Sequence, residues 1–417
     1  MTTFAVSFLG CKVSLADAEA IRDALRAAGH EEREAGQAEV HVVNTCAVTV
    51  EAEKKSRKVV SRSARGGART FVSGCAAGLN AGQFGGPGVA VVARDPDRAA
   101  AEILEVLGTG PACGNDAPAP APGGRTRAFL KVQDGCDNRC SFCVIRVARG
   151  PGRSRPAGDL VAEVARRVAE GRPEVAVTGI SVGAYRAPDT GDDLAGLVRR
   201  LCAVPGLERL RISSIEPDDL GPALLAVLAA DPVAAPHLHV PLQAGDPAVL
   251  RAMQRHHTAD EWLEAVSRAR RRVPGLNLTT DVIVGFPGED EAAFGRTVAL
   301  VEEAGVTKVH VFPFSARPGT PAAAMPGHLA PEVVRERAGR LRDLSDRQGA
   351  RHRRARVGSA DRVLVERVLA DGARTGYGAD YTRFILPPGP EGPGRMVQVI
   401  VAGAAGGHLE GRPLHAG

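Results

Sequence analysis

The chain of 417 residues has no run of about 18 apolar residues, so it offers no transmembrane helix. Its first eight residues lack the basic segment of a secretion signal and instead predict a strand. Eight cysteines are too few for a disulfide scaffold in a chain of this size, and they fit metal ligands in a reducing compartment. These absences exclude a membrane protein and a small secreted scaffold, and we expect a cytoplasmic protein without a membrane partner.

The length predicts two or three domains, and the apolar and charged fractions, 44% and 24%, are those of a soluble globular protein. A net charge of +5 is compatible with nucleic-acid binding but does not identify it. Arginine outnumbers lysine in a chain rich in Ala, Gly and Pro, as a GC-rich genome would produce, so single arginines carry little weight.

Three cysteines, Cys136, Cys140 and Cys143, fall within eight residues directly after the strand-like run 128–133. A structural zinc ion needs four ligands, so three thiolates suit it poorly. A [4Fe–4S] cluster held by three thiolates keeps one iron open for a small molecule. The spacing therefore favours such a cluster over a zinc knuckle or a redox dithiol.

The N-terminal region alternates strand-like and helix-like segments, which predicts a doubly wound parallel sheet. The expected strands are 4–9, 39–44, 70–73 and 89–92, and the expected helices are 16–28 and 50–65.

Cys11, Cys46 and Cys75 each follow one of these strands by one or two residues. Because parallel strands end at one edge of their sheet, we expect the three thiols to converge there. They would form a second iron–sulfur site with one free iron. The alternative is three separate buried cysteines that act as small apolar residues.

The helix 50–65 carries the only lysine cluster of the chain. It predicts either an RNA phosphate contact or a solvated helix face. The candidate RNA-binding residues are Lys54, Lys55, Arg57, Lys58 and Arg62. The following Pro/Ala/Gly-rich segment 111–124 predicts a linker, in which Cys113 has no expected role.

The central region repeats a strand-then-helix rhythm six times, two units short of a closed (β/α) barrel, and so predicts an open partial barrel. The expected strands are 128–133, 174–179, 209–214, 237–243, 277–285 and 308–314. Residues near the strand ends, or beside the third cysteine, are the candidate cofactor contacts: Phe142, Thr178, Gly179, Ser213, Ser214, Glu216, Gln243 and Gly285. His237 and His239 share one strand face and are interpreted as structural histidines.

The C-terminal region begins with an Arg-rich helix at 331–356 and continues with short strand-like runs between Gly- and Pro-rich turns. About sixty residues of this kind predict a small five-stranded barrel of the OB type. Its aromatic and basic residues suit base stacking and phosphate attraction, or else fill a small core. The candidate RNA-binding residues are Arg374, Tyr377, Tyr381 and Arg383.

All three regions together resemble a radical S-adenosylmethionine (SAM) methylthiotransferase with a C-terminal TRAM domain. The motifs that carry the resemblance are Leu9-Gly-Cys-Lys-Val13, Val43-Asn-Thr-Cys-Ala-Val-Thr49, Gln133-Asp-Gly-Cys136 to Arg155, Leu238 to Gly245, Asp281 to Glu289 and Ser315 to Pro321. They are most similar to the branch that acts on N6-threonylcarbamoyladenosine beside the tRNA anticodon. The chain departs from that pattern at Ser14, Arg146, Ala244 and His257, none of which is a cluster ligand.

The resemblance implies two [4Fe–4S] clusters and SAM, which serves as radical source and methyl donor. Cys136, Cys140 and Cys143 would hold the cluster that cleaves SAM, and Cys11, Cys46 and Cys75 an auxiliary cluster that carries the sulfur. The methylthio group would go to adenine C2 in the tRNA anticodon stem-loop, because an unactivated aromatic C–H needs a radical. A flavodoxin or ferredoxin would supply electrons.

The implied domains are 1–110 for the auxiliary cluster, 125–355 for radical SAM chemistry and 356–417 for RNA binding. Three alternatives remain: methylthiolation of a ribosomal protein, methylthiolation of a small metabolite, or an iron–sulfur RNA-binding protein without catalysis.

Overall fold

The structure is a computed structural model that describes residues 1–110 and 125–414, and these residues form two compact units. The first unit takes 1–110, Asp134–Arg153 and Ser315–Ala323, and the second takes 125–133, Ser154–Phe314 and 324–414. The predicted linker 111–124, with Cys113, lies outside the described residues. Within the described ranges, no helix combines the length and apolar character that a membrane crossing requires.

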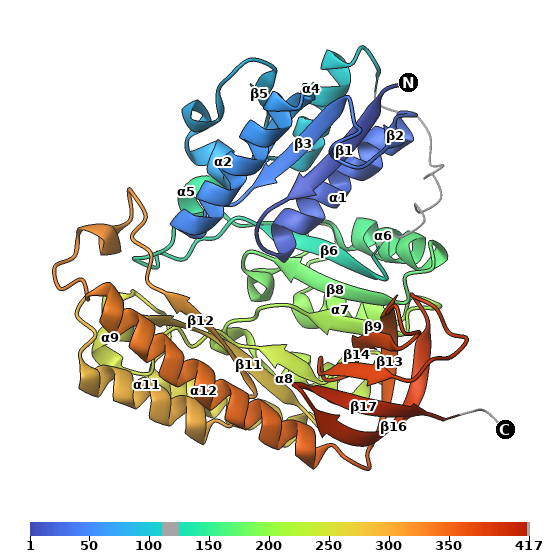
Figure 1. The fold of residues 1–417 in the computed structure, drawn as a ribbon. Helices are drawn as coiled ribbons and strands as arrows, with labels where there is room; N and C mark the ends of the chain where they lie inside the picture. The colour runs from blue at the N-terminus through green and yellow to red at the C-terminus, as the bar shows by residue number, and fades with distance from the viewer. Residues whose placement is uncertain (111–124, 415–417) are drawn as a thin grey trace. The chain divides into compact units, whose positions relative to one another are not determined.

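The first unit contains a parallel five-stranded sheet of order β2-β1-β3-β4-β5, with helices on both faces, so the predicted doubly wound fold is confirmed (Figure 1). Its strands are β1 Thr3–Phe8, β2 Glu31–Glu32, β3 Val40–Thr45, β4 Arg69–Gly74 and β5 Val89–Val91. Its helices are α1 Lys12–Ala27, α2 Val50–Arg65, α3 Cys75–Leu79, η1 Ala81–Phe84, α4 Pro96–Val106 and α5 Ile145–Arg149.

Two apolar cores lie in this unit. One packs side chains of α1 and α4, such as Ile21 and Ile103, against Phe71 of the sheet. The other joins Val72 of β4 to side chains of α2, α3 and α5, among them Ala148. Since α5 follows the three-cysteine loop directly, this second core fastens the loop to the N-terminal sheet.

The second unit begins with a partial barrel of six parallel strands, as predicted. β6 Arg127–Asp134, β8 Glu174–Gly179 and β9 Arg209–Ile212 form one sheet, with β7 Arg153–Ser154 beside β6, and β10 His237–His239, β11 Asn277–Val284 and β12 Lys308–Pro313 form the other. Parallel bridges from Leu210 to Ala234 and from Ser214 to His239 join the two sheets. β10 ends earlier than the predicted 243 because Pro241 cannot donate to a sheet.

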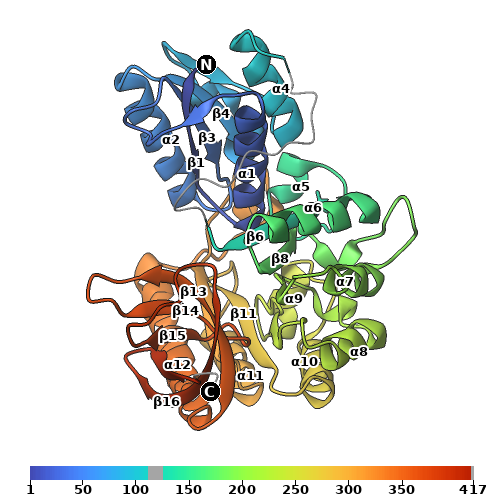
Figure 2. The same cartoon turned by 90° about the vertical axis from the view of Figure 1, so that its right-hand side faces the viewer.

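The barrel helices are α6 Ala157–Ala169, η2 Val182–Ala184, α7 Leu194–Cys202, η3 Pro217–Asp219, α8 Pro222–Ala230, α9 Pro247–Ala252, α10 Ala259–Arg272, α11 Glu291–Glu303 and α12 Pro331–Ala355. The short η4 Pro321–Ala324 lies almost wholly in the first unit. The chain then forms a closed barrel of order β13-β14-β15-β17-β16, which confirms the predicted five strands (Figure 2). Its strands are β13 Ala360–Val368, β14 Arg374–Tyr377, β15 Arg383–Leu386, β16 Met396–Ala405 and β17 His408–Pro413.

Glu174, at the start of β8, is fully buried and joins the two barrels through three arginines. It pairs with Arg127, with Arg209 at 3.1 Å and with Arg211 at 2.7 Å. Arg209 and Arg211 also donate to the backbone oxygens of Tyr377 and Gly378, which belong to the small barrel. Burial alone would raise the pKa of Glu174, but the three arginines outweigh it and lower the pKa to about 2.

Replacing Glu174 by Gln is expected to destabilise the second unit by about 3–5 kcal/mol, because three guanidinium groups keep their burial and lose their shared charge. Thermal or denaturant unfolding measures this change. The control is Glu264→Gln, since Glu264 is 60% exposed and its pair with Arg271 is expected to contribute less than about 1 kcal/mol. Equal effects of the two substitutions would contradict the role of Glu174.

Candidate active site

Three thiols of the first unit lie at one edge of its sheet, as the sequence predicts. Cys11 caps the start of α1 after β1, Cys46 directly follows β3, and Cys75 opens α3 after β4. Since β1, β3 and β4 are neighbours in a parallel sheet, their carboxyl ends meet. The three cysteines therefore lie along one edge of the sheet.

Two glycines make room for this approach. A Cβ on Gly10 would lie 3.0 Å from Cys46 Cβ and 3.1 Å from its sulfur. A Cβ on Gly74 would lie 2.5 Å from both the Thr45 carbonyl oxygen and Asn44 Oδ1. Gly74 also has φ +94° and ψ −172°, a backbone conformation that is almost confined to glycine.

The site is suited to a metal cluster in two respects. Burial, reinforced by the charges of Cys11 and Cys75, raises the pKa of Cys46 to about 11, and burial also raises the pKa of Cys75. Such thiols bind metal by giving up their protons. Beside them, the Asn44 amide is buried with neither its oxygen nor its nitrogen paired in the described structure, which fits a polar group bound at this edge.

Arg149, at the end of α5, is buried and contacts residues of the N-terminal sheet region and of the segment before the three-cysteine loop. Its Nε donates to Cys75 Sγ at 3.0 Å, while Nη1 and Nη2 donate to Asp134 at 3.0 Å and Asp17 at 2.8 Å. Burial opposes its charge, but Cys75, Asp17 and Asp134 outweigh burial and raise its pKa. A single guanidinium thus links Cys75 to the residue that precedes the three-cysteine loop.

The loop that carries Cys136, Cys140 and Cys143 is built around tight backbone contacts. Cys136 N donates to Gly150 O at 3.0 Å, and Cys143 N donates to Cys140 O at 3.1 Å. A Cβ on Gly135 would lie 2.0 Å from Pro151 O, so this position requires glycine. The three cysteines are half-buried, and a backbone N–H, that of Ile145, approaches Cys143 Sγ at 3.4 Å.

Each cysteine triad supplies three thiols. A [4Fe–4S] cluster takes each thiolate on a different iron, whereas a structural zinc ion needs four ligands. The number of thiols in each triad therefore fits a cluster better than it fits one zinc ion.

Several predicted cofactor contacts lie at the carboxyl ends of the barrel strands. Thr178 is buried beside Ser213, whose hydroxyl lies 3.4 Å from Thr178 Oγ1. A Cβ on Gly179 would lie 2.9 Å from Gln133 O, so the glycine permits close packing of β8 on β6. The sequence did not reveal Gln133, whose Oε1 accepts from the N–H groups of Ile180 and Ser181 and holds the loop after β8.

The remaining contacts have varied surroundings. Gln243 has φ +68°, a conformation uncommon outside glycine, and is half-buried. Gly285 N donates to Glu289 Oε1 at 3.1 Å, and Arg337 in turn holds Glu289 at 2.7 Å. The carboxylate of Glu216 pairs with Arg255. Phe142 is half-buried in the first unit and Ser214 is half-buried in the second.

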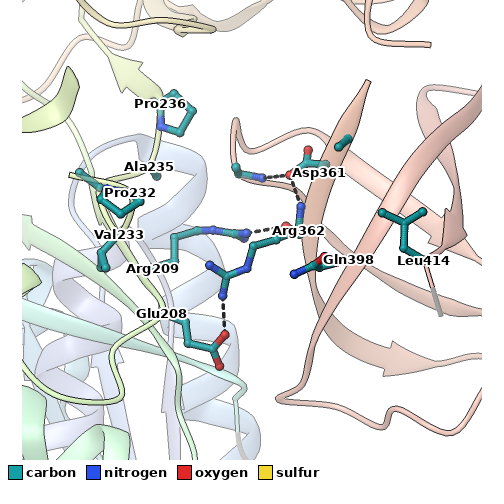
Figure 3. Close-up of a pocket in the computed structure, with 13 residues that line it drawn as sticks. Glu208, Arg209, Pro232, Val233, Ala235, Pro236, Asp361, Arg362, Gln398 and Leu414 are labelled. Carbon is teal, nitrogen blue, oxygen red and sulfur yellow. Dashed lines mark hydrogen bonds and ion pairs between the residues drawn. The ribbon is translucent and has the colours of Figure 1, made fainter. Parts of the chain in front are cut away.

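A cavity of about 300 Å³ lies elsewhere in the second unit, where the residues before β10 meet β13 (Figure 3). Arg209 and Arg362 point into it, and Arg362 pairs with Glu208. It lies at the amino ends of the barrel strands. Since parallel strands bind ligands at their carboxyl ends, this cavity is a junction between two barrels and not the candidate active site.

Comparisons with known proteins agree with this arrangement. The family described as the Radical SAM superfamily matches residues 130–301, and the Uncharacterized protein family UPF0004 matches residues 3–85. The Threonylcarbamoyladenosine tRNA methylthiotransferase MtaB of Thermotoga maritima is 34% identical over 92% of this chain and 91% of its own length. That of Bacillus subtilis is 33% identical over 99% and 96%. The tRNA-2-methylthio-N(6)-dimethylallyladenosine synthase of Sorangium cellulosum is 36% identical over 88% and 82%.

The chain belongs to the radical-SAM methylthiotransferase family. It is therefore an enzyme of a family that uses SAM and a [4Fe–4S] cluster. Among solved structures, the radical SAM methyltransferase TsrM of Kitasatospora setae superposes with a TM-score of 0.56 at 15% identity, covering 78% of this chain and 75% of that one. At this identity the likeness concerns the fold alone.

The predicted RNA-binding residues of this methylthiotransferase differ in their exposure to solvent. Lys54, Lys55, Lys58 and Arg62 are exposed on α2, as an RNA contact requires. Arg57 is half-buried, and its Nη1 donates to Glu53 at 3.0 Å and to Gln83 at 2.6 Å.

In the small barrel the prediction was partly wrong. Arg374 is buried and its guanidinium is held by Glu391 and the Pro387 carbonyl, so it is not available to RNA. Tyr377 and Tyr381 stack on each other with ring centroids 5.0 Å apart, and Arg127 lies over both rings. These tyrosines close the junction of the two barrels, the structural alternative that the sequence left open. Arg383 is exposed.

Sequence reasoning gave Arg149 no role although it lies in a motif that carried the resemblance. Arginine is so frequent in this chain that a single arginine gives no signal of a special role. In addition, the buried partner Asp17 lies in α1, far from Arg149 in the sequence. The other carboxylate partner of Arg149, Asp134, is closer in the sequence and precedes the three-cysteine loop.

We expect Gly74→Ala to lower the iron content of the anaerobically purified enzyme and its thermal stability, because the new Cβ would collide with Asn44 and Thr45 beside Cys75. The control is Gly67→Ala, since Gly67 also has positive φ (+85°) but no atom within 4 Å of a Cβ. That control should cost only the backbone strain, about 1–2 kcal/mol. Iron loss of the same size in both variants would contradict the account of Gly74.

Proposed function

We propose that this enzyme adds a methylthio group to C2 of N6-threonylcarbamoyladenosine at position 37 of tRNA. The observation that supports it most is the pair of cysteine triads in the first unit, in a chain alignable almost end to end with relatives named for this substrate. The two triads fit a reaction that needs both a radical and a sulfur donor.

In this proposal Cys136, Cys140 and Cys143 bind the cluster that serves SAM, and Cys11, Cys46 and Cys75 bind an auxiliary [4Fe–4S] cluster. When bound, the clusters supply reductive cleavage of SAM and a site for the transferred sulfur. The protein residues hold the thiolates in place: Gly10 and Gly74 admit the sulfurs to one edge, and Arg149 donates to Cys75. The donated hydrogen bond stabilises the thiolate form of Cys75.

SAM is assigned to the carboxyl ends of the barrel strands. Gly179 and Gly285 allow close backbone approach, and Ser213, Ser214, Thr178, Gln243 and Glu216 offer polar groups to a ribose or an amino group. Phe142 is assigned to the adenine. An electron donor such as a flavodoxin or ferredoxin completes the reaction.

The RNA is assigned to the exposed cations of α2 and to Arg383 of the small barrel. This retains the division of labour among residues 1–110, 125–355 and 356–417. Arg374, Tyr377 and Tyr381 are left out of it because their contacts are internal.

A second candidate substrate is N6-dimethylallyladenosine in tRNA. Relatives named for its modification are 34–36% identical to this chain, similar to those named for threonylcarbamoyladenosine. The first candidate is preferred because this chain covers 91% and 96% of two relatives named for threonylcarbamoyladenosine, but 82% and 84% of two relatives named for the dimethylallyl nucleoside.

The two-cluster proposal predicts about eight iron atoms per chain after anaerobic reconstitution. Replacing Cys11, Cys46 and Cys75 together by Ala should leave about four, because the other triad keeps its ligands. Replacing buried Cys202 by Ala serves as the control, since it lies in α7 of the second unit and should retain all the iron. About four iron atoms in the unaltered enzyme would end the proposal of a second cluster.

The substrate proposal predicts that deleting the gene removes 2-methylthio-N6-threonylcarbamoyladenosine from cellular tRNA. Mass spectrometry of digested tRNA measures this nucleoside, and a plasmid copy should restore it. The dimethylallyl derivative should stay unchanged. Loss of that derivative instead would favour the second candidate, and no change in either would leave a protein or a metabolite as substrate.

A further inference from the structure

A cluster of three polar side chains in the second unit takes no part in the site described above. His239 of β10, Asp281 of β11 and His310 of β12 lie on adjacent strands. His239 Nε2 is 3.1 Å from Asp281 Oδ1, and the rings of His239 and His310 are 5.4 Å apart. One nitrogen or oxygen atom from each side chain falls within 4.8 Å of the other two.

The cluster lies on the strand face opposite the helices. On β12, Val309 is buried, whereas His310 and Phe312 on the other face are exposed. The side chains of Asp281 and His239 keep 26% and 13% of their surface exposed. A ligand on this face of the barrel can therefore reach all three.

Neighbouring residues fix the orientation of His239. Thr279 Oγ1 lies 2.9 Å from His239 Nδ1 and 3.1 Å from His237 Nε2, while Asp281 holds the other nitrogen of His239. His239 and Asp281 are thus set in place before any ligand binds, which lowers the cost of ordering them. His237 is buried against Thr279, as its predicted structural role requires. His239 also contacts Thr279, but its side chain remains partly exposed.

The face becomes apolar toward the carboxyl ends of the strands. Asp281 is paired in register with His310, and Ile283 is paired with Phe312 two residues further on. Two residues of a strand span roughly 6.6 Å. A purine against Ile283 and Phe312 would therefore direct a substituent of comparable length toward the polar cluster.

We propose that His239, Asp281 and His310 bind the threonylcarbamoyl substituent, with His310 donating to its carboxylate and Asp281 accepting from its hydroxyl or N–H. This inference rests on the proposed function. A dimethylallyl group has neither a carboxylate nor a hydroxyl, so it would gain no hydrogen bond from the two groups that the cluster offers to those parts of the substituent. The cluster would thus determine which modified adenosine the barrel accepts.

Two histidines and a carboxylate also suit a divalent cation. The separation of 3.1 Å between His239 Nε2 and Asp281 Oδ1 is compatible with both a hydrogen bond and a shared ion, so bound metal is measured as part of the test.

The test uses the reconstituted enzyme, whose bound zinc and manganese are measured, and three anticodon stem-loop RNAs. One carries threonylcarbamoyladenosine, one its methyl ester, which lacks the negative charge, and one dimethylallyladenosine. Methylthiolation rates give kcat/KM for each. The unaltered enzyme should prefer the acid by about tenfold or more, since a hydrogen bond to a charged group contributes about 1.5–3 kcal/mol. His310→Leu should abolish this preference by lowering kcat/KM for the acid alone. Lys308→Gln, on the same strand face, should keep it.

Three outcomes overturn the inference. If the unaltered enzyme modifies the acid RNA and His310→Leu retains the preference, the cluster does not read the carboxylate, although the proposed function stands. If the unaltered enzyme modifies only a dimethylallyl RNA, the proposed function fails together with the inference. If His310→Leu loses one equivalent of bound zinc or manganese and added metal restores its rate, the cluster is a metal site.

Discussion

The buried guanidinium of Arg149 is the contact on which the first unit depends. It reaches Cys75 at the sheet edge, Asp17 in α1 and Asp134 before the three-cysteine loop, and all these partners lie far from it in the sequence or across a turn. A buried charge with its partners removed costs several kcal/mol, so the three segments are constrained to stay together. The two sets of cysteines are thereby parts of one compact unit.

The same unit shows why a cluster site needs more than its cysteines. Gly10, Gly74 and Gly135 each stand where a Cβ would collide with backbone or with a sulfur. The cysteines come from four segments, and only the parallel sheet and the core around Val72 and Ala148 bring those segments together. The position of the cysteines therefore depends on the packed core, on the glycines and on the ion pairs of Arg149.

Much of this could be predicted from the sequence. The period of strands and helices indicated the doubly wound sheet and the six-stranded partial barrel, since each depends on local patterns. The bounds of α2 were predicted at both ends because Thr49 caps it and Gly66 ends it. α4 was missed although Asp95 caps it, and the short α3, α5 and α9 carry too few residues for a periodic signal.

The failures concern residues whose partners are distant. Arg374 and Tyr381 are residue types that often bind RNA. In the structure, however, Arg374 pairs with Glu391, and the guanidinium groups of Arg127 and Arg211 lie over the ring of Tyr381. His239, Asp281 and His310 were not connected because three strands must align before they meet. Local sequence patterns predict helices, strands and their buried faces. Contacts between residues of different elements become known only from the three-dimensional structure.

The most direct test of the account is the iron content of Arg149→Leu, purified anaerobically and read together with the EPR spectrum of the dithionite-reduced protein. Measurements belong at a temperature where circular dichroism shows the variant folded, with Arg149→Lys beside it to separate charge from geometry. The account predicts loss of the iron bound near Cys75 and an altered EPR signal from what remains. Iron content and EPR signals identical to those of the unaltered enzyme would contradict it.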